Sequence, residues 1–333
     1  MSINEEKKLI CVTGASGYIG SWIVKLLLEK GYKVRACLRN HLDSNRTKFL
    51  KDLDVEGGNL EFADGELVGN KTDYESIFQG CYAVLHVASP YLHVFEDKER
   101  DLVKPAVEGT LSVINACSKV STVRKLIITS STAAVVNLLN PDLKPLDEYS
   151  DANWNEESTI DSGTYSYSKV QAEKAAWNFH KENQKNSNTN QFELATVNPT
   201  FVLGPLLSKQ NNTSVDQFIK IITEAQNVGP IRRGFVDVRD VALAHLLVLE
   251  SSQSNNTRYL VAERVCQFKE LPLTAQKLFP TLKISNELPG ETTVKPWKFN
   301  TDKIQNIGLK YLTFEQTLKD TIDSLVSFGI INL

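Results

Sequence analysis

Short, mostly apolar runs recur along the chain and alternate with longer stretches in which apolar residues stand three or four positions apart. Each run has the length of a strand that is buried on both faces of a parallel sheet. The runs cover residues 9–12, 33–38, 60–63, 83–88, 125–129, 192–197 and 258–261. The stretches between them have the periodicity of amphipathic helices. This alternation predicts an α/β fold with a doubly wound parallel sheet.

Three glycines spaced by three, Gly14, Gly17 and Gly20, separate the first run from an amphipathic helix over residues 19–27. A glycine turn between a strand and a helix lets backbone approach a ligand closely, and the helix N-terminus attracts an anion. Glycine turns alone occur in many loops. Here a second strand at residues 33–38 completes the strand, turn, helix and strand that a dinucleotide site requires. We therefore expect a pyrophosphate group to bind at this turn.

The regular alternation breaks down after residue 203 and returns only briefly before residue 250. The remaining stretch is mixed and ends in an amphipathic helix near residues 314–328. We expect residues 1–202 and 234–261 to form a Rossmann-type dinucleotide-binding domain. Residues 203–233 and 262–333 are then expected to form a smaller, mostly C-terminal lobe that binds the substrate.

Composition and charge narrow the class of protein. Among 333 residues, 41% are hydrophobic and 23% are charged, as in ordinary soluble globular proteins. The net charge of −3 argues against nucleic acid or an anionic membrane as a partner. The five cysteines form no metal-binding spacing, so we expect no metal and a reducing compartment. The polar, acidic start of the chain and the lack of long apolar runs predict a cytoplasmic protein without membrane contact.

The end of the second predicted strand bears on the choice of dinucleotide. An acidic residue usually meets a free ribose 2′-hydroxyl there, but this chain has Arg39, followed by Arg46. Guanidinium groups bind phosphate well because they donate parallel hydrogen bonds and stay charged. Unless both arginines are ordinary solvated residues, the pattern favours NADP(H) over NAD(H). Asp64, at the end of the third strand, either meets the adenine edge or is simply a polar residue that follows a strand.

Side chains that can perform chemistry stand at two later points of the chain. Ser130 and Ser131 follow the fifth strand, at the sheet edge where ligands of open α/β sheets bind. Tyr165 and Lys169 are four residues apart in a predicted helix, so they share one face of that helix. His86, inside the fourth apolar run, is expected to be a buried, hydrogen-bonded histidine rather than a catalytic one.

These motifs together resemble the extended short-chain dehydrogenase/reductases, and the resemblance runs from about residue 9 to the last helix. Within that family the chain is most similar to NADPH-dependent carbonyl reductases of the yeast methylglyoxal and ketone reductase type. Plant dihydroflavonol and cinnamoyl-CoA reductases resemble it more distantly. The motifs that carry the resemblance are Thr-Gly-Ala-Ser-Gly-Tyr-Ile-Gly at residues 13–20, Ser131, Tyr165-x-x-x-Lys169, Asn198-Pro199-Thr200 and Phe-Val-Asp-Val-Arg-Asp-Val at residues 235–241.

The resemblance implies that Ser131, Tyr165 and Lys169 are catalytic, and the chemistry of carbonyl reduction supports these roles. NADPH supplies the hydride. Free tyrosine has a pKa of about 10, and an ammonium one helical turn away lowers it, so Tyr165 can donate the proton. Ser131 holds the carbonyl oxygen, an interaction worth about 3 kcal/mol. Ser130 is less expected because the family places the catalytic serine last in the pair, and Tyr167 has no lysine four residues later.

The resemblance also implies which residues contact NADP(H). They lie in the glycine turn, at the end of the second and third strands, and at the ends of the later strands. The expected cofactor contacts are Gly14, Ser16, Gly17, Tyr18, Ile19, Gly20, Arg39, Arg46, Asp64, Val87, Ala88, Ser89, Thr129, Tyr165, Lys169, Pro199 and Val202.

We therefore expect an enzyme that transfers hydride from NADPH to the carbonyl of a small aldehyde, ketone or dicarbonyl, acting as a monomer or homodimer. A sugar-nucleotide dehydratase would need carboxylates beside the catalytic hydroxyl, and residues 132–136 contain none. An epimerase holds NAD, for which the strand-end acid is missing. A non-catalytic NADPH-binding scaffold would tend to lose the Tyr/Lys pair.

Apolar residues near the motifs indicate the kind of substrate pocket. Val135, Val136, Phe201 and Leu203, with the segment 91–95, are expected to line an apolar pocket, although segment 91–95 could instead fasten the next helix to the sheet. Plant flavonoid reductases have an asparagine where Val136 stands, which counts against a polyhydroxylated ring. The cinnamoyl-CoA reductase pattern around the catalytic tyrosine is also not reproduced here.

Overall fold

The computed structural model describes residues 7–67, 72–90, 96–137, 146–209, 213–224, 231–284, 292 and 294–333. Its centre is a seven-stranded sheet in the order β10-β7-β5-β4-β1-β2-β3, in which every neighbouring pair is parallel. The strands are β1 (Leu9–Thr13), β2 (Lys33–Leu38), β3 (Leu60–Asp64), β4 (Ala83–His86), β5 (Lys125–Thr129), β7 (Glu193–Pro199) and β10 (Thr257–Val261). The predicted fold class and all seven predicted strands are confirmed.

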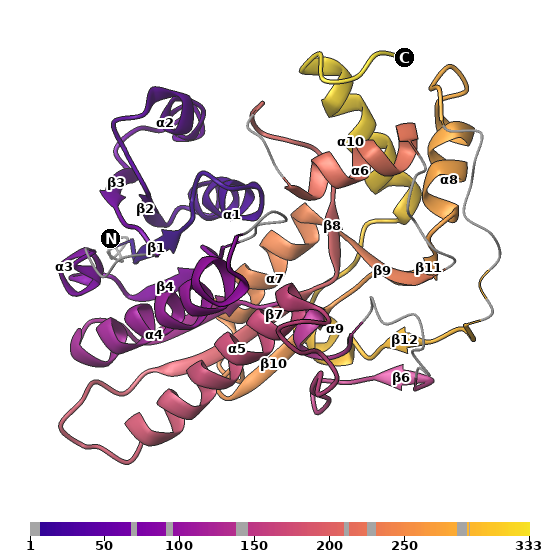
Figure 1. Ribbon diagram of the computed structural model, residues 1–333. Coiled ribbons are helices and arrows are strands. Elements are labelled where there is room, and N and C mark those ends of the chain that lie inside the picture. The colour runs from indigo at the N-terminus through magenta and orange to yellow at the C-terminus, as the bar shows by residue number, and fades with distance from the viewer. Residues whose placement is uncertain are drawn as a thin grey trace.

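Helices cover both faces of this sheet (Figure 1). One face packs on α1 (Tyr18–Glu29) and α7 (Val238–Glu250) through a core that includes Ile10 and Val12. The other face packs on α4 (Lys104–Lys119) and α5 (Thr164–Asn183), which lie side by side. Successive residues of a strand point to opposite faces, so the apolar residues 9–12 of β1 fill both cores in turn. The remaining helical elements on this sheet are α2 (Ser44–Lys51), α3 (Tyr74–Phe78) and the short turns η1 (Glu99–Val103) and η2 (Thr132–Ala134).

A second, three-stranded sheet lies on the side of the molecule away from α2, α3 and α4 (Figure 1). It consists of β8 (Phe201–Leu203), β9 (Arg232–Asp237) and β11 (Arg264–Gln267), with β8 parallel and β11 antiparallel to β9. Its apolar core is shared with α6 (Thr213–Glu224), α8 (Glu270–Leu278) and α10 (Phe314–Ser327). The remaining elements are β6 (Glu148–Tyr149), its parallel partner β12 (Lys298–Phe299), and α9 (Asp302–Asn306).

The two cores follow the predicted lobe boundaries only in part. Phe201 and Phe235, placed by the sequence in the dinucleotide-binding domain, belong to the core of the second sheet. Ile304 and Leu309, from the predicted substrate lobe, pack into the core of the central sheet. The division into two lobes stays a prediction. All five cysteines are buried: Cys266 lies in the second core, and the other four lie between the central sheet and α4 and α5.

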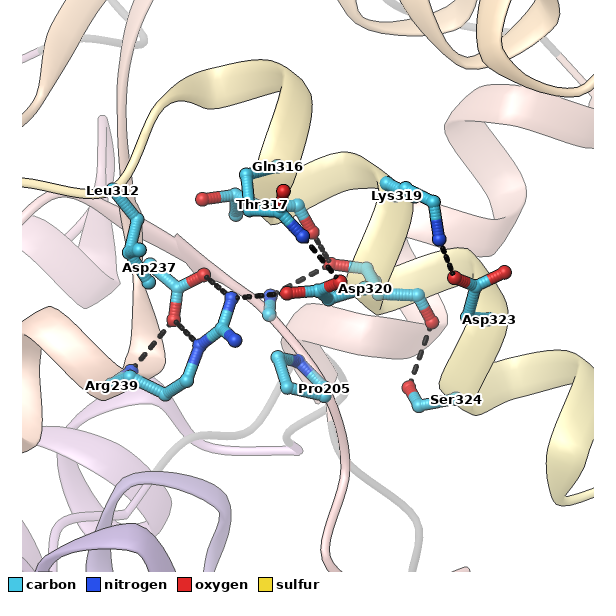
Figure 2. Close-up of polar contacts among 12 residues, drawn as sticks. Pro205, Asp237, Arg239, Leu312, Gln316, Thr317, Lys319, Asp320, Asp323 and Ser324 are labelled. Carbon is cyan, nitrogen blue, oxygen red and sulfur yellow. Dashed lines mark hydrogen bonds and ion pairs between the residues drawn. The ribbon is translucent and has the colours of Figure 1, made fainter.

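Polar contacts join the two parts of the structure. Arg239, on α7, lies between Asp237 and Asp320 of α10, with Nη2 2.7 Å and 2.8 Å from their carboxylates (Figure 2). Asp237 also caps α7 by accepting a hydrogen bond from the Arg239 N–H at 2.8 Å. The neighbouring segment 204–206 is held by α1, because Tyr18 Oη donates to the Gly204 carbonyl at 2.6 Å. No helix among the residues described is both long and apolar enough to cross a membrane.

Candidate active site

A cleft of about 740 Å³ lies at the carboxyl ends of the central strands. The order of strands reverses between β1 and β4, and open α/β sheets bind their ligands at such a reversal. The cleft is lined on one side by residues of the central sheet and on the other by the second sheet and the segments beside it. Every residue predicted as catalytic lines it, and so does every predicted cofactor contact except Asp64.

The glycine turn between β1 and α1 forms one end of the cleft. Gly14 has a φ of +68°, and a Cβ atom there would lie 2.9 Å from backbone atoms of Ala88. A Cβ atom at Gly20 would lie 2.2 Å from the Gly14 carbonyl oxygen. Side chains at these positions would therefore push apart the turn, the helix and the segment that follows β4. No side chain caps α1 at Gly17 and no acid lies in its first turn, so the positive end of the helix dipole is left for an anion. This turn fits a pyrophosphate group.

Both arginines after β2 line the cleft. Arg46, in α2, is held by Asp43, with Nε 3.2 Å from the carboxylate, and Asp43 also caps α2. Arg39 makes no hydrogen bond or ion pair with any residue that the structure describes, so its guanidinium group is available to a ligand. Two cations at this end of the cleft fit an anionic group such as a ribose 2′-phosphate.

Asp64 does not line the cleft, and its contact with the adenine edge stays a prediction. The carboxylate of Asp64 accepts a hydrogen bond from the backbone N–H of His41 at 2.7 Å, so it fixes the loop that follows β2. The residues that line the cleft at this point are the next three, Gly65, Glu66 and Leu67. The end of β3 therefore reaches the cleft through these three residues.

Tyr165 and Lys169 lie on α5 and face the cleft one helical turn apart. The Lys169 Nζ atom is 5.6 Å from the centroid of the Tyr165 ring and donates a hydrogen bond to Ser89 Oγ at 2.8 Å. Burial lowers the pKa of Lys169 to about 8, although the carboxylate of Glu173 raises it. At neutral pH the amine therefore remains mainly protonated, and its positive charge lies beside the phenol.

Ser131 follows β5 at the start of the short turn η2. Its Oγ atom accepts a hydrogen bond from the Ala133 N–H at 3.1 Å, and no residue within the described ranges accepts its proton, which can therefore be donated to a substrate oxygen. The hydroxyl of Ser130 has a different use, because it donates to the buried Glu173 carboxylate at 2.5 Å. Tyr167, the alternative tyrosine, does not line the cleft.

His86 is buried at the point where β4 meets β1. Its Nδ1 atom lies 2.8 Å from Thr13 Oγ1, and burial together with the nearby Lys169 charge lowers the pKa of His86 to about 3. The ring is neutral at physiological pH and links two strands. The structure thus agrees with a buried, partnered histidine.

The substrate side of the cleft differs from the sequence-based expectation. Phe201 lines it, but Val135, Val136 and Leu203 do not. Both valines are buried in a small apolar cluster that includes Trp297, and Leu203 is buried in the core of the second sheet. Segment 91–95 lies outside the described residues. The sequence did not point to several other cleft residues, most of which follow residue 203, where the alternation fails. They are Ala133, Leu206, Leu207, Ser208, Thr213, Ser214 and Arg233.

Comparisons with known proteins give matches over nearly the whole chain. Residues 10–262 match the NAD dependent epimerase/dehydratase family. Cinnamoyl-CoA reductase 1 of Arabidopsis thaliana is 37% identical over 330 residues, which cover 97% of this chain and 90% of that protein. The bifunctional dihydroflavonol 4-reductase/flavanone 4-reductase of Malus domestica is 31% identical and covers 99% of this chain and 94% of its own length.

Solved structures match equally well in shape. The yeast methylglyoxal/isovaleraldehyde reductase complexed with NADPH superposes with a TM-score of 0.83 at 28% identity, over 97% of this chain and 100% of that one. Vestitone reductase from alfalfa, Medicago sativa, superposes with a TM-score of 0.80 at 28% identity, over 98% and 100% of the two chains.

Proposed function

Because this chain belongs to the NAD-dependent epimerase/dehydratase family and, within it, to the extended short-chain dehydrogenase/reductases, we propose that it reduces the carbonyl of a small aldehyde, ketone or dicarbonyl with NADPH. The family, the fold and the class of NADP(H)-dependent oxidoreductase that the sequence predicted are confirmed. The proposal that the substrate is a small carbonyl compound rests on one observation. The Lys169 ammonium lies beside Tyr165, in a cleft that also contains the glycine turn.

The residues that would hold the cofactor follow from the cleft. The turn at Gly14 and the start of α1 would bind the pyrophosphate, and Arg39 and Arg46 the 2′-phosphate. Lys169 uses one of its three N–H donors on Ser89, which leaves the others for the nicotinamide ribose. When bound, NADPH supplies the hydride.

The proton and the charge are handled by the protein. Tyr165 donates its phenolic proton to the carbonyl oxygen, and the Lys169 ammonium favours the phenolate that remains. The Ser131 hydroxyl donates a hydrogen bond to the same oxygen, where negative charge develops during the transfer. The Ala133 N–H fixes Ser131 Oγ for this task.

Replacing Tyr165 with Phe tests the proposal. The phenol is the proton donor, so we expect kcat to fall by about 10²–10⁴-fold. NADPH affinity should stay within about threefold, because Lys169 and the glycine turn remain. NADPH oxidation is followed by nicotinamide absorbance against aldehydes, dicarbonyls and aryl ketones, with cinnamoyl-CoA and a dihydroflavonol included because relatives bear those names.

Tyr167→Phe is the matched control, because Tyr167 lies two residues further on and outside the cleft. It should retain wild-type turnover. A wild-type protein that binds NADPH but reduces no carbonyl of the panel, with Tyr165→Phe indistinguishable from it, would instead indicate a non-catalytic NADPH-binding scaffold.

A further inference from the structure

A buried carboxylate, Glu173, lies behind the catalytic face of α5 and has no part in the steps above. It follows Lys169 by one helical turn and Tyr165 by two, so all three share one side of the helix. Glu173 is 2% exposed. Burying a charged carboxylate is costly unless it is paired and hydrogen-bonded. The ion pair and hydrogen bonds that Glu173 makes therefore indicate its role.

Arg258, on β10, supplies the opposite charge. Its Nε atom is 2.6 Å from Glu173 Oε1, and its Nη1 atom donates to the carbonyls of Asp151 and Asn153 at 2.6 Å and 2.7 Å. The guanidinium group also lies 3.8 Å from the centroid of the Trp154 ring. Because Arg258 is itself held on several sides, the position of the Glu173 carboxylate is fixed relative to the sheet.

The other carboxylate oxygen, Oε2, reaches the residues around Ser131. It accepts from Ser130 Oγ at 2.5 Å and from Asn198 Nδ2 at 2.8 Å. The same Asn198 amide donates its second hydrogen to the Ser131 carbonyl at 3.2 Å. Glu173 thereby holds Ser131 through two neighbours, the preceding residue Ser130 and the amide of Asn198. One carboxylate ties the end of β5 to the helix that carries Tyr165 and Lys169.

Glu173 also acts on the charge of Lys169. The ionisable groups near that amine are Tyr165 and Glu173 on α5 and His86 on β4, with Arg258 of β10 behind Glu173. His86 is neutral at physiological pH. Glu173 is the anion that opposes the effect of burial on Lys169. Removing its charge would make both the ammonium and the neighbouring phenol easier to deprotonate.

We propose that Glu173 is a positioning residue of this site, which fixes Ser131 against Tyr165 and Lys169 and keeps Lys169 positively charged. The inference rests on the proposed reductase function. It extends that function by one residue which touches neither substrate nor cofactor.

Glu173→Gln tests the inference, because it keeps the shape of the side chain and removes the charge. We expect kcat to fall by about 10–100-fold while the KM for NADPH changes by less than about threefold, since the glycine turn and the two arginines are untouched and a neutral Lys169 amine still donates hydrogen bonds. The alkaline limb of the kcat–pH profile should move to lower pH by about one unit, because Lys169 loses the anion that opposes the effect of burial on its charge. A loss of folding alone would reduce the amount of active enzyme without moving that limb.

Two further variants separate charge from stability. Glu173→Gln with Arg258→Met removes both buried charges, so its melting temperature should exceed that of Glu173→Gln while the alkaline limb stays displaced. Trp177→Phe removes one hydrogen bond to Glu173 and keeps the charge, so the limb should stay at the wild-type pH. Displacement of the limb in Trp177→Phe, or a wild-type limb in both Glu173 variants, would overturn the proposal.

A measurement without turnover distinguishes this inference from the proposed function. The Lys169 amine is titrated by NMR in ¹⁵N-lysine-labelled protein, with Lys169→Met to assign the signal. Its pKa should be lower in Glu173→Gln than in the wild type even if no carbonyl of the panel is reduced. An unchanged titration would refute the role in holding the charge of Lys169, whereas a wild type without reductase activity would refute only the proposed function.

Discussion

Arg39 is the residue on which the choice between the two dinucleotides depends. It lines the cleft at the end of β2, where no described residue pairs with it. We expect Arg39→Asp to weaken NADPH binding by about 10–100-fold, the worth of a charge-assisted hydrogen bond to phosphate. NADH binding should change less, because NADH has no 2′-phosphate. The dissociation constants of both cofactors measure the effect.

The control for this substitution is Arg124→Asp, which makes the same change of charge before β5, outside the cleft. It should leave the preference between the cofactors unchanged. A wild type that uses NADH better than NADPH would show that Arg39 is not a ligand of the 2′-phosphate.

At the scale of single residues, the sequence predicts the site well where the signal is local. The glycine turn and the Tyr165–Lys169 pair each depend on spacing within one turn or one helix, and the structure brings them to one cleft. Asp64 and Val136 lie outside the cleft, and neither a polar residue after a strand nor an apolar one after a serine reveals which way it faces. Val136 is buried in an apolar cluster that includes Trp297, and no local pattern encodes a cluster built from such distant segments.

The order of similarity to relatives was also misjudged from short motifs. The expected greater distance of cinnamoyl-CoA reductases does not hold for the proteins compared, since the Arabidopsis enzyme shares 37% of residues and the yeast reductase 28%. The five residues around Tyr165 are few among the 330 aligned positions.

Among the elements, α7 makes a contact that should respond to pH. Asp240 lies in its first turn, is 3% exposed and accepts a hydrogen bond from the Leu312 N–H at 3.0 Å. Burial raises the pKa of Asp240 to about 7, from 3.8 for a free side chain. The folded protein therefore favours the protonated form. The contribution that protonated Asp240 makes to the stability of the fold is complete below about pH 4 and is lost as the pH rises to about 7.

Asp240→Asn isolates this contribution, because the amide stays neutral and its oxygen can still accept from Leu312. We expect the melting temperature of the variant, relative to that of the wild type, to increase as the pH rises from about 5 to about 8, because only the wild type loses the contribution of protonated Asp240. Thermal unfolding of both proteins across this range measures the difference. Two curves that remain parallel would show that Asp240 does not titrate in this window.

The sequence predicts where the strands lie along the chain better than it predicts which elements contact one another. The seven central strands follow from their apolar runs, because a strand buried on both faces must be apolar throughout. The ion pair between Arg239 and Asp320 could not be predicted from the sequence, since the two residues are distant in the chain and both are of types that are common on protein surfaces. Pairings of this kind depend on how the second sheet docks.

For the whole molecule, the second core is the part that the sequence predicted least. A smaller substrate lobe was expected, but Phe201 and Phe235 pack in its core while Ile304 returns to the central sheet. Chain order therefore gives only an approximate boundary. The cytoplasmic location and the monomeric or dimeric state stay predictions from composition and from resemblance.

Because all five thiols are buried, their reaction with an added alkylating agent would measure how often the structure around each of them unfolds. Burial raises the pKa of Cys37 and of Cys266 to about 12, so both are protonated and enclosed in the native state. Alkylation by a maleimide would therefore record unfolding events. If the two cores open separately, mass spectrometry in mild denaturant should find Cys266 modified at a different rate from the other four. Uniform modification of all five would mean that the chain opens as one cooperative unit and that the lobes are not independent.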